Sequence, residues 1–185
     1  YKTPNVSDAA FDCLSNRKDL EFVTCVATNF TGTGLKALRG LPKLRKLELE
    51  DCPLTEVGLK ELPQLDVTSV NFYESTVTDR GAWYISYTPT LEYVNVSKAQ
   101  LSDIGLAYMV RLPELKYLYL LGANVTDQSA EILAKMKKLS FLDLRETRIG
   151  DKTLKQLATL PNLKTLLVRD TGVTKEAIDE FKKKR

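Results

Sequence analysis

The feature that most constrains the fold of this chain is an apolar frame of the form L-x-x-L-x-L that recurs seven times. The frames begin at Leu20, Leu44, Val67, Leu91, Leu115, Leu139 and Leu163, so every interval is 24 residues except one of 23. Alternating apolar residues predict a short strand with one buried face. A period held along 185 residues indicates a stack of equivalent units, each of which buries its apolar face against its neighbours.

Each unit carries a second apolar pair beyond the strand, which predicts a helix. The clearest pairs are Leu35 with Leu38, Leu106 with Met109, and Leu154 with Leu157. The segment before them reads V-T-D in the clearest copies, where Thr and Asp can accept hydrogen bonds from the first helical turn. Pro42, Pro89, Pro113 and Pro161 are predicted to end the helices. Strand, turn and helix in this order force a parallel sheet with the helices on one side.

These motifs resemble the cysteine-containing type of leucine-rich repeat, which occurs in F-box proteins and in many bacterial proteins. The family's Cys/Asn/Thr position after the strand corresponds here to Thr28, Cys52, Ser75, Thr147 and Thr171, and Ala99 and Ala123 depart from it. The resemblance covers essentially the whole chain. It implies an α/β leucine-rich-repeat solenoid, a short horseshoe of about seven repeats with strands on the concave face and helices on the convex face, and says little about the ligand.

The repeat pattern predicts a single solenoid over residues 1–185. It comprises a truncated first repeat at 1–19, repeats over 20–173 and a C-terminal helix at 174–185. Val6 to Asp8 align with Val125 to Asp127, so Tyr1 is expected to lie within a repeat whose earlier part is upstream. Pro63 arrives three residues early and predicts a kink in the outer surface, with neutral loop variation as the alternative.

Charge and hydropathy argue against two classes of partner. The net charge is +3, and the basic residues are scattered rather than clustered, so no nucleic-acid surface is expected. No apolar run reaches the roughly 18 residues of a membrane span, so no membrane insertion is expected. The run Lys182 to Arg185 fits the carbonyl end of a helix, with a targeting signal as the alternative.

The cysteines bear on the cellular compartment. Cys13, Cys25 and Cys52 cannot all pair internally, and their repeat positions favour small buried residues. Free buried thiols are therefore expected, which favours a reducing, cytoplasmic compartment. An exported bacterial protein stays open as the alternative.

The residues between the buried leucines should face outward from the sheet, because side chains alternate along a strand. Read from repeat to repeat, they place one apolar and aromatic patch on the concave face, made of Tyr73, Tyr93, Tyr117, Tyr119, Leu121 and Phe141. Glu48 flanks the patch on one side, and Arg145 and Arg169 flank it on the other. Opposite charges there would orient a partner, and clustered Tyr and Arg are typical of binding sites. The alternative is that aromatic residues simply suit strands.

A second aromatic group is expected on the convex face, where Tyr84, Tyr108 and Ile132 share one repeat position near Trp83 and Tyr87. Packing between helices of the stack explains such a ridge. A second interface is the alternative.

Catalytic chemistry has no support in the sequence. The chain has no His, no recognisable nucleophile and base, no phosphate-binding glycine loop and no cysteines at zinc spacing, so no enzyme, cofactor or metal site is expected. Asp79, Asp103 and Asp127 recur at a cap position and are interpreted as structural. The sequence therefore predicts a non-catalytic module that binds a protein or peptide partner. A spacer segment of a larger protein is one alternative. The resemblance to F-box proteins implies another, a ubiquitin-ligase substrate receptor, although no F-box motif is present.

Overall fold

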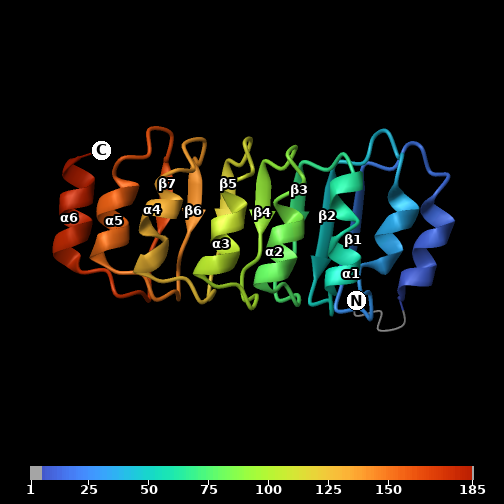
Figure 1. The fold of residues 1–185 in the computed structure, drawn as a ribbon, viewed down its shortest axis with the longest axis horizontal. Coiled ribbons are helices and arrows are strands. Elements are labelled where there is room, and N and C mark those ends of the chain that lie inside the picture. Colours follow the sequence, from blue (N-terminus) through green and yellow to red (C-terminus); the bar gives the residue numbers. More distant parts are fainter. Residues whose placement is uncertain (1–5, 185) are drawn as a thin grey trace.

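A computed structural model describes residues 6–184, which form a stack of strand–turn–helix units (Figure 1). Seven strands make one sheet in chain order, and each pairs in parallel with the next. They are β1 (Phe22–Val26), β2 (Lys46–Glu50), β3 (Ser69–Asn71), β4 (Tyr93–Asn95), β5 (Tyr117–Tyr119), β6 (Phe141–Asp143) and β7 (Thr165–Leu167). All seven coincide with the predicted frames, and the leucine-rich-repeat solenoid is confirmed.

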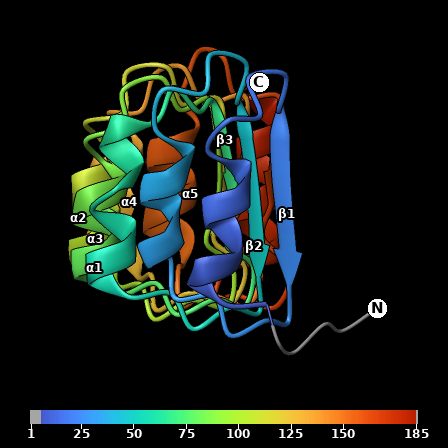
Figure 2. The same cartoon turned by 90° about the vertical axis from the view of Figure 1, so that its right-hand side faces the viewer.

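The helices form a second layer on one side of the sheet (Figure 2). They are η1 (Asp8–Leu14), η2 (Thr33–Leu38), α1 (Glu56–Leu59), η3 (Leu62–Gln64), α2 (Asp79–Ile85), α3 (Asp103–Met109), η4 (Asp127–Ser129), α4 (Ala130–Leu133), α5 (Asp151–Leu157) and α6 (Lys175–Lys183). The elements named η are 3₁₀ helices, so the first two repeats carry a tighter helix than the central ones. Of the expected truncated repeat, Tyr1–Asn5 lie outside the described residues, as does Arg185 of the basic run.

The frame leucines fill the space between the two layers. Leu47, Val70, Val94, Leu118 and Leu142 are fully buried, and each such side chain contributes about 1.5–3 kcal/mol of hydrophobic stabilisation. The 23-residue interval does not disturb the sheet, because Lys46 still lies opposite Ser69 in register. The early Pro63 is accommodated on the helix side, where α1 ends at Leu59 and η3 follows.

A residue in the left-handed conformation follows each of the seven strands. The φ values are 53° at Ala27, 49° at Asp51, 56° at Glu74, 60° at Lys98, 69° at Gly122, 56° at Glu146 and 59° at Asp170. In this conformation the N–H of Lys98 donates to the Leu121 carbonyl at 2.7 Å, and that of Gly122 donates to the Arg145 carbonyl at 2.9 Å. The turn therefore ties each repeat to the next one.

Five aspartates, Asp8, Asp79, Asp103, Asp127 and Asp151, form what we call the aspartate ladder. Asp103 illustrates it: Oδ1 accepts from the Thr126 N–H at 2.9 Å, and Oδ2 accepts from the Thr126 hydroxyl at 2.7 Å. The carboxylate thus caps the helix of the following repeat, whereas the sequence predicted capping of its own helix. That local role belongs to the preceding Thr or Ser, as when Thr78 Oγ1 accepts from the Gly81 N–H at 3.2 Å. The aspartate reaches the next repeat because neighbouring helices begin side by side.

Hydrogen bonding lowers the pKa of two of these carboxylates, Asp8 and Asp127. Burial by itself raises the pKa of Asp127, but hydrogen bonds from the Thr153 hydroxyl and the Gly150 and Thr153 amides outweigh it and lower the pKa below its usual value. The same balance, with bonds from Thr31 and Gly34, lowers the pKa of Asp8.

The joint between η2 and α1 has no carboxylate, because Gly32 stands at the ladder position. Gly32 has a φ of 92°, and a Cβ added to Gly58 would lie 2.5 Å from its Cα and 2.5 Å from the Thr31 carbonyl oxygen. Thr55 instead donates its N–H to the Thr31 carbonyl at 2.9 Å. This joint closes by direct contact between backbones.

The three cysteines are free, but only two are buried. Burial, with Cys52 nearby, raises the pKa of Cys25 to about 11. Cys13 is exposed, contrary to the sequence prediction. Its repeat equivalent Ala37 is only half-buried, so this position lies on the flank of the helix rather than in the core.

Candidate functional site: the strand face

The solvent-exposed side of the sheet, here called the strand face, carries the aromatic residues predicted from the sequence. The register places Tyr93 opposite Tyr117 and Tyr117 opposite Phe141, while Tyr119 lies between Asn95 and Asp143. We define the aromatic cluster as Tyr93, Tyr117, Tyr119 and Phe141. It spans the three consecutive strands β4, β5 and β6.

The four rings form a continuous chain of contacts from Tyr117 through Tyr93 and Tyr119 to Phe141. The ring centroids are 6.3 Å apart for Tyr93 and Tyr117, 5.1 Å for Tyr93 and Tyr119, and 4.5 Å for the stacked pair Tyr119 and Phe141. These separations fall in the favourable range for aromatic pairs. Burial, together with the neighbouring Tyr119, raises the pKa of Tyr93 to about 12. Tyr117 is the most outward ring, with 42% of its surface exposed. The cluster is thus packed within itself and open to solvent.

Tyr73 lies apart from this cluster, although the sequence placed it in the same patch. Among the described residues, its ring makes no contact with the four clustered rings. Its hydroxyl interacts with Glu74, which raises the Tyr73 pKa, and its side chain lines a cavity with Thr24 and Glu50. Leu121, two residues beyond the end of β5, is half-buried.

Three strand-face side chains that alternation places toward solvent accept hydrogen bonds from backbone N–H groups instead. Asn71, Asn95 and Asp143 each accept, through Oδ1, the N–H of the residue two positions on, at 3.2, 2.9 and 3.1 Å. Asn95 and Asp143 are buried as a result. Short side chains that bond two residues ahead are the usual signal for such turns. The recurrence of Asn and Asp at one repeat position could have revealed this role.

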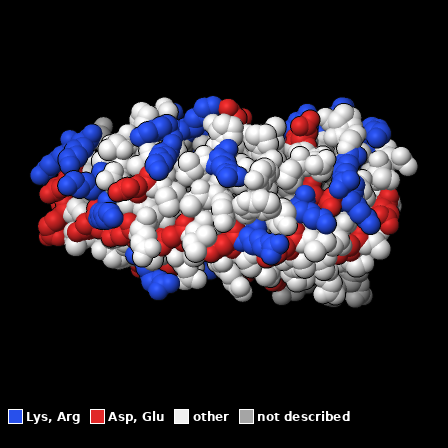
Figure 3. All heavy atoms as spheres, in the orientation of Figure 1, with Lys and Arg blue, Asp and Glu red and all other residues white. Residues whose placement is uncertain are grey.

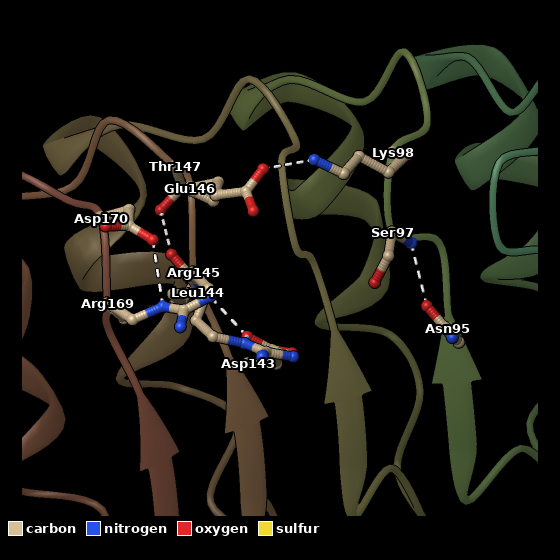
Figure 4. A network of polar contacts seen from close by, with 10 residues as sticks. All are labelled: Asn95, Ser97, Lys98, Asp143, Leu144, Arg145, Glu146, Thr147, Arg169 and Asp170. Atoms are coloured by element: carbon tan, nitrogen blue, oxygen red, sulfur yellow. Dashed lines mark hydrogen bonds and ion pairs between the residues drawn. The ribbon is translucent and has the colours of Figure 1, made fainter.

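Every flanking charge has a partner of opposite sign beside it. Lys46 Nζ lies 2.6 Å from Glu48 Oε1, and hydrogen bonding from Lys46 lowers the Glu48 pKa. Arg145 donates to buried Asp143 from Nε and Nη2, the latter at 2.7 Å (Figure 4). Arg169 Nε lies 3.0 Å from Asp170. The sequence suggested a negative charge at one end of the patch and a positive charge at the other. These ion pairs neutralise much of both charges.

One ion pair crosses a whole repeat above the strand ends. Lys98 pairs with Glu146, two repeats away (Figure 4). The side chain passes over Gly122, where an added Cβ would meet the Lys98 Cδ at 2.9 Å. The absence of a side chain at Gly122 therefore opens the path for this contact beside the cluster.

The predicted helix-face ridge divides into two parts. Trp83 contacts Tyr84 and Tyr87 edge-on, each at 4.9 Å between centroids, and the Arg111 guanidinium lies 5.3 Å from the Tyr87 ring centroid. Tyr84 and Ile132 pack against the core.

The second part of the ridge borders a cavity. Tyr108 and Ile132 line a shallow cavity of about 390 Å³ with exposed Ile104. Figure 3 shows Lys and Arg interspersed with Asp and Glu along this face. Packing within the stack accounts for Tyr84 and Ile132.

Residues 6–184 contain no group of three or more His, Cys, Asp or Glu side chains placed to hold a metal ion. Across the same residues, every helix is too short or too polar to cross a membrane.

Comparisons with known proteins identify the architecture. A family model described as a leucine rich repeat matches residues 40–62. An internalin of Listeria monocytogenes is similar over 98% of this chain and 50% of its own, with 19% identity and a TM-score of 0.75. Internalin C2 of the same organism covers 94% of this chain and 71% of its own, with 22% identity and a TM-score of 0.72.

A leucine-rich-repeat protein of Leptospira interrogans is similar over 94% of this chain and 49% of its own, with 16% identity and a TM-score of 0.69. The chain thus spans about half the length of two of these three proteins. No curated protein sequence matches it. At these identities the likeness shows the fold, which is a leucine-rich-repeat solenoid built like those of the bacterial internalins.

Proposed function

We propose that the protein is a non-catalytic binding module that captures a polypeptide on the aromatic cluster of the strand face. The observation that carries the proposal is the cluster itself: four rings on three adjacent strands pack together while Tyr117 stays 42% exposed. A surface of this kind offers a partner a rigid apolar area whose ordering costs little entropy.

The chemistry of the cluster favours a polypeptide over a purely apolar ligand. Three of its four members are tyrosines, which present an apolar ring and a hydroxyl that can donate and accept hydrogen bonds. Tyr and Arg dominate the energetics of many protein interfaces. The expected contact set is Tyr93, Tyr117, Tyr119 and Phe141, with Leu121 and Arg145 at its rim and Tyr73, Glu48 and Arg169 farther out.

We also assign the repeats to the cysteine-containing type. Cys52 is buried, with Sγ 3.2 Å from the Glu50 carbonyl, and Thr147 and Thr171 at the same position donate to the carbonyls of Leu144 and Val168 at 2.6 and 2.7 Å. A small side chain that can satisfy the turn is what this position requires. The assignment supports the fold class and adds nothing about the partner.

Selection of peptides from a displayed random library against the intact protein tests the binding proposal. The selected peptides should lose at least tenfold in affinity, or about 1.4 kcal/mol, when Tyr117 and Tyr119 are both replaced by Ala. The matched control is Tyr87→Ala, which removes a 45% exposed tyrosine from the helix face. Circular dichroism and the unfolding temperature establish that both variants fold.

Equal affinity of the selected peptides for the wild type and the double variant would exclude the cluster as the binding site. Failure to select any peptide would favour the alternative of a spacer segment in a larger protein.

A further inference from the structure

An apolar patch interrupts the charged outer surface of the helix layer at α2 and α3. One outward-facing helix position carries a charge in five of the seven repeats, at Lys36, Lys60, Glu131, Lys155 and Asp179. The two repeats between Lys60 and Glu131 have Trp83 and Ala107 there instead. Since five repeats fold with a charge at this position, the apolar exchange points to a role outside the fold.

The same change occurs one helical turn earlier, in a hollow between α3 and α4. Ile104 is 63% exposed, whereas the neighbouring repeats have Arg80 and Gln128 at its position. With Tyr108 and Ile132 it lines the shallow cavity of about 390 Å³. We call this hollow the helix-face groove.

Aromatic side chains extend the apolar surface from the groove toward α2. Trp83 packs edge-on against Tyr87, which is 45% exposed. Arg111 Nη1 donates to the Tyr87 hydroxyl at 2.8 Å and joins this residue to the repeat that contains α3. Exposed Trp and Tyr side chains of this kind are frequent anchors in protein interfaces.

The helix-face groove has charges of opposite sign at its two ends. Asp103 begins α3, and exposed Glu131 lies in the first turn of α4. Arg111 and Lys135, which share one repeat position, follow the other ends of these helices. Among residues 6–184, no ion pair involves Glu131, Arg111 or Lys135. Figure 3 shows a band of Asp and Glu near the starts of the helices.

An amphipathic helix antiparallel to α3 is the partner that fits these charges. Its first turn would lie near Arg111 and Lys135, and its last turn near Asp103 and Glu131. A helix is stabilised by acidic residues in its first turn and by basic residues in its last turn. The charges that suit the two ends of such a helix are therefore the charges that this groove attracts.

We propose that the helix-face groove, with Trp83 and Tyr87 beside it, docks an amphipathic helix of a partner protein. The helix lies antiparallel to α3, with an apolar stripe against Ile104 and Tyr108, acidic residues in its first turn and basic residues in its last. This surface is separate from the aromatic cluster, on the other side of the sheet, and does not depend on what the cluster binds.

A displayed library of helical peptides tests the proposal. The peptides have about 15 residues, leucines fixed along one stripe and randomised end turns, and are selected against the intact protein. We expect peptides whose affinity falls at least about tenfold for Ile104→Lys, because the ammonium group would be covered in the groove. Arg111→Glu combined with Lys135→Glu should lower their affinity about fivefold, since the acidic first turn would meet like charges.

Two matched controls separate binding from loss of structure. Val57→Lys places the same side chain at the same repeat position on α1, away from the groove, and Lys152→Glu combined with Lys155→Glu reverses two charges on α5. Both should change the affinity by less than about twofold. The unfolding temperature of Ile104→Lys should stay within about 2 °C of the wild type, as for other surface substitutions.

The proposal would be overturned if no selected peptide distinguished the wild type from Ile104→Lys, or if reversal of Arg111 and Lys135 left the affinity unchanged. A fall of more than about 5 °C in the unfolding temperature of Ile104→Lys would also overturn it, because Ile104 would then serve the fold. Wild-type dimers in sedimentation that Ile104→Lys dissociates would assign the groove to a second copy of this chain, which would likewise contradict the proposal.

Discussion

Two joints in the same solenoid hold the helices of adjacent repeats together by different contacts. Between α3 and α4, the Asp103 carboxylate bridges to Thr126 and Ser129. Between η2 and α1, Gly32 and Gly58 bring their backbones into direct contact without a carboxylate. The comparison teaches that the stacking of helices can be fixed by charge-assisted hydrogen bonds or by the absence of side chains. The carboxylate joint should tolerate changes in volume, and the glycine joint should not. At the joint made by Asp127, whose pKa is lowered, stability should also depend on pH.

The largest effect is expected from Gly58→Ala. The new Cβ would lie 2.5 Å from the Cα of Gly32, and backbone atoms cannot move aside without displacing a repeat. We expect a loss of about 3 kcal/mol in the free energy of unfolding, measured by urea denaturation.

Gly81→Ala is the matched control, because it occupies the same repeat position but meets the flexible Leu59 Cδ1 at 2.8 Å. It should cost less than about 1 kcal/mol, since Ala also favours the helix. Equal losses in the two variants would show that the Gly32 and Gly58 contact is not what closes this joint.

Asp103→Ala should follow in size. It removes the acceptor for the Thr126 N–H, the Thr126 hydroxyl and the Ser129 hydroxyl, and leaves part-buried donors unsatisfied. We expect a loss of about 2 kcal/mol in the free energy of unfolding. Asp103→Asn keeps one acceptor oxygen and should lose less; if Asn and Ala were equally destabilising, the ladder bonds to Thr126 would not be the cause.

Acid should separate the two kinds of joint. The folded-state pKa of Asp127 lies below its unfolded value, so its contribution to stability is present above about pH 4 and disappears as the pH falls through the folded pKa. Asp127→Asn should therefore lose less stability between pH 6 and pH 3 than the wild type does. Urea denaturation at both pH values measures this. An unchanged pH dependence in the variant would show that Asp127 does not titrate with unfolding.

The smallest effect should come from an attempt to extend the ladder. Glu56 stands at the ladder position of α1 and pairs with Arg80, its carboxylate 3.1 Å from Nε. Glu56→Asp shortens the side chain to the length used by Asp79 and directs it to Thr78 and Gly81. We expect a gain of about 0.5 kcal/mol in the free energy of unfolding. Asp51→Glu, on the exposed turn after β2, is the control and should change little.

Most of the fold follows from the sequence because burial imposes a strict period on it. The frame beginning at Leu115 predicts β5 and its buried Leu118 directly. Interactions between repeats are harder to read, since the V-T-D motif does not say which helix the aspartate reaches. The structure shows that Asp79 reaches Ser102 and Gly105 of the next repeat.

The candidate site shows the same limit. The two-residue alternation correctly brings Tyr93, Tyr117, Tyr119 and Phe141 to one face. Alternation gives the face of a side chain but not its rotamer or its bonding partner. Asp143 therefore turned out to be buried under Arg145, and Tyr73 interacts with Glu74 rather than with the four rings.

The contact of Lys98 with Glu146 over Gly122 has a consequence for how such a chain can change during evolution. Repeats of equal length can in principle be duplicated, deleted or exchanged one at a time where their joints use the same ladder and turn contacts. Here three consecutive units share one interaction, and a bulkier residue at Gly122 would block it. Exchange of any one of those three units should therefore remove this ion pair as well as the contacts of the unit's own joints.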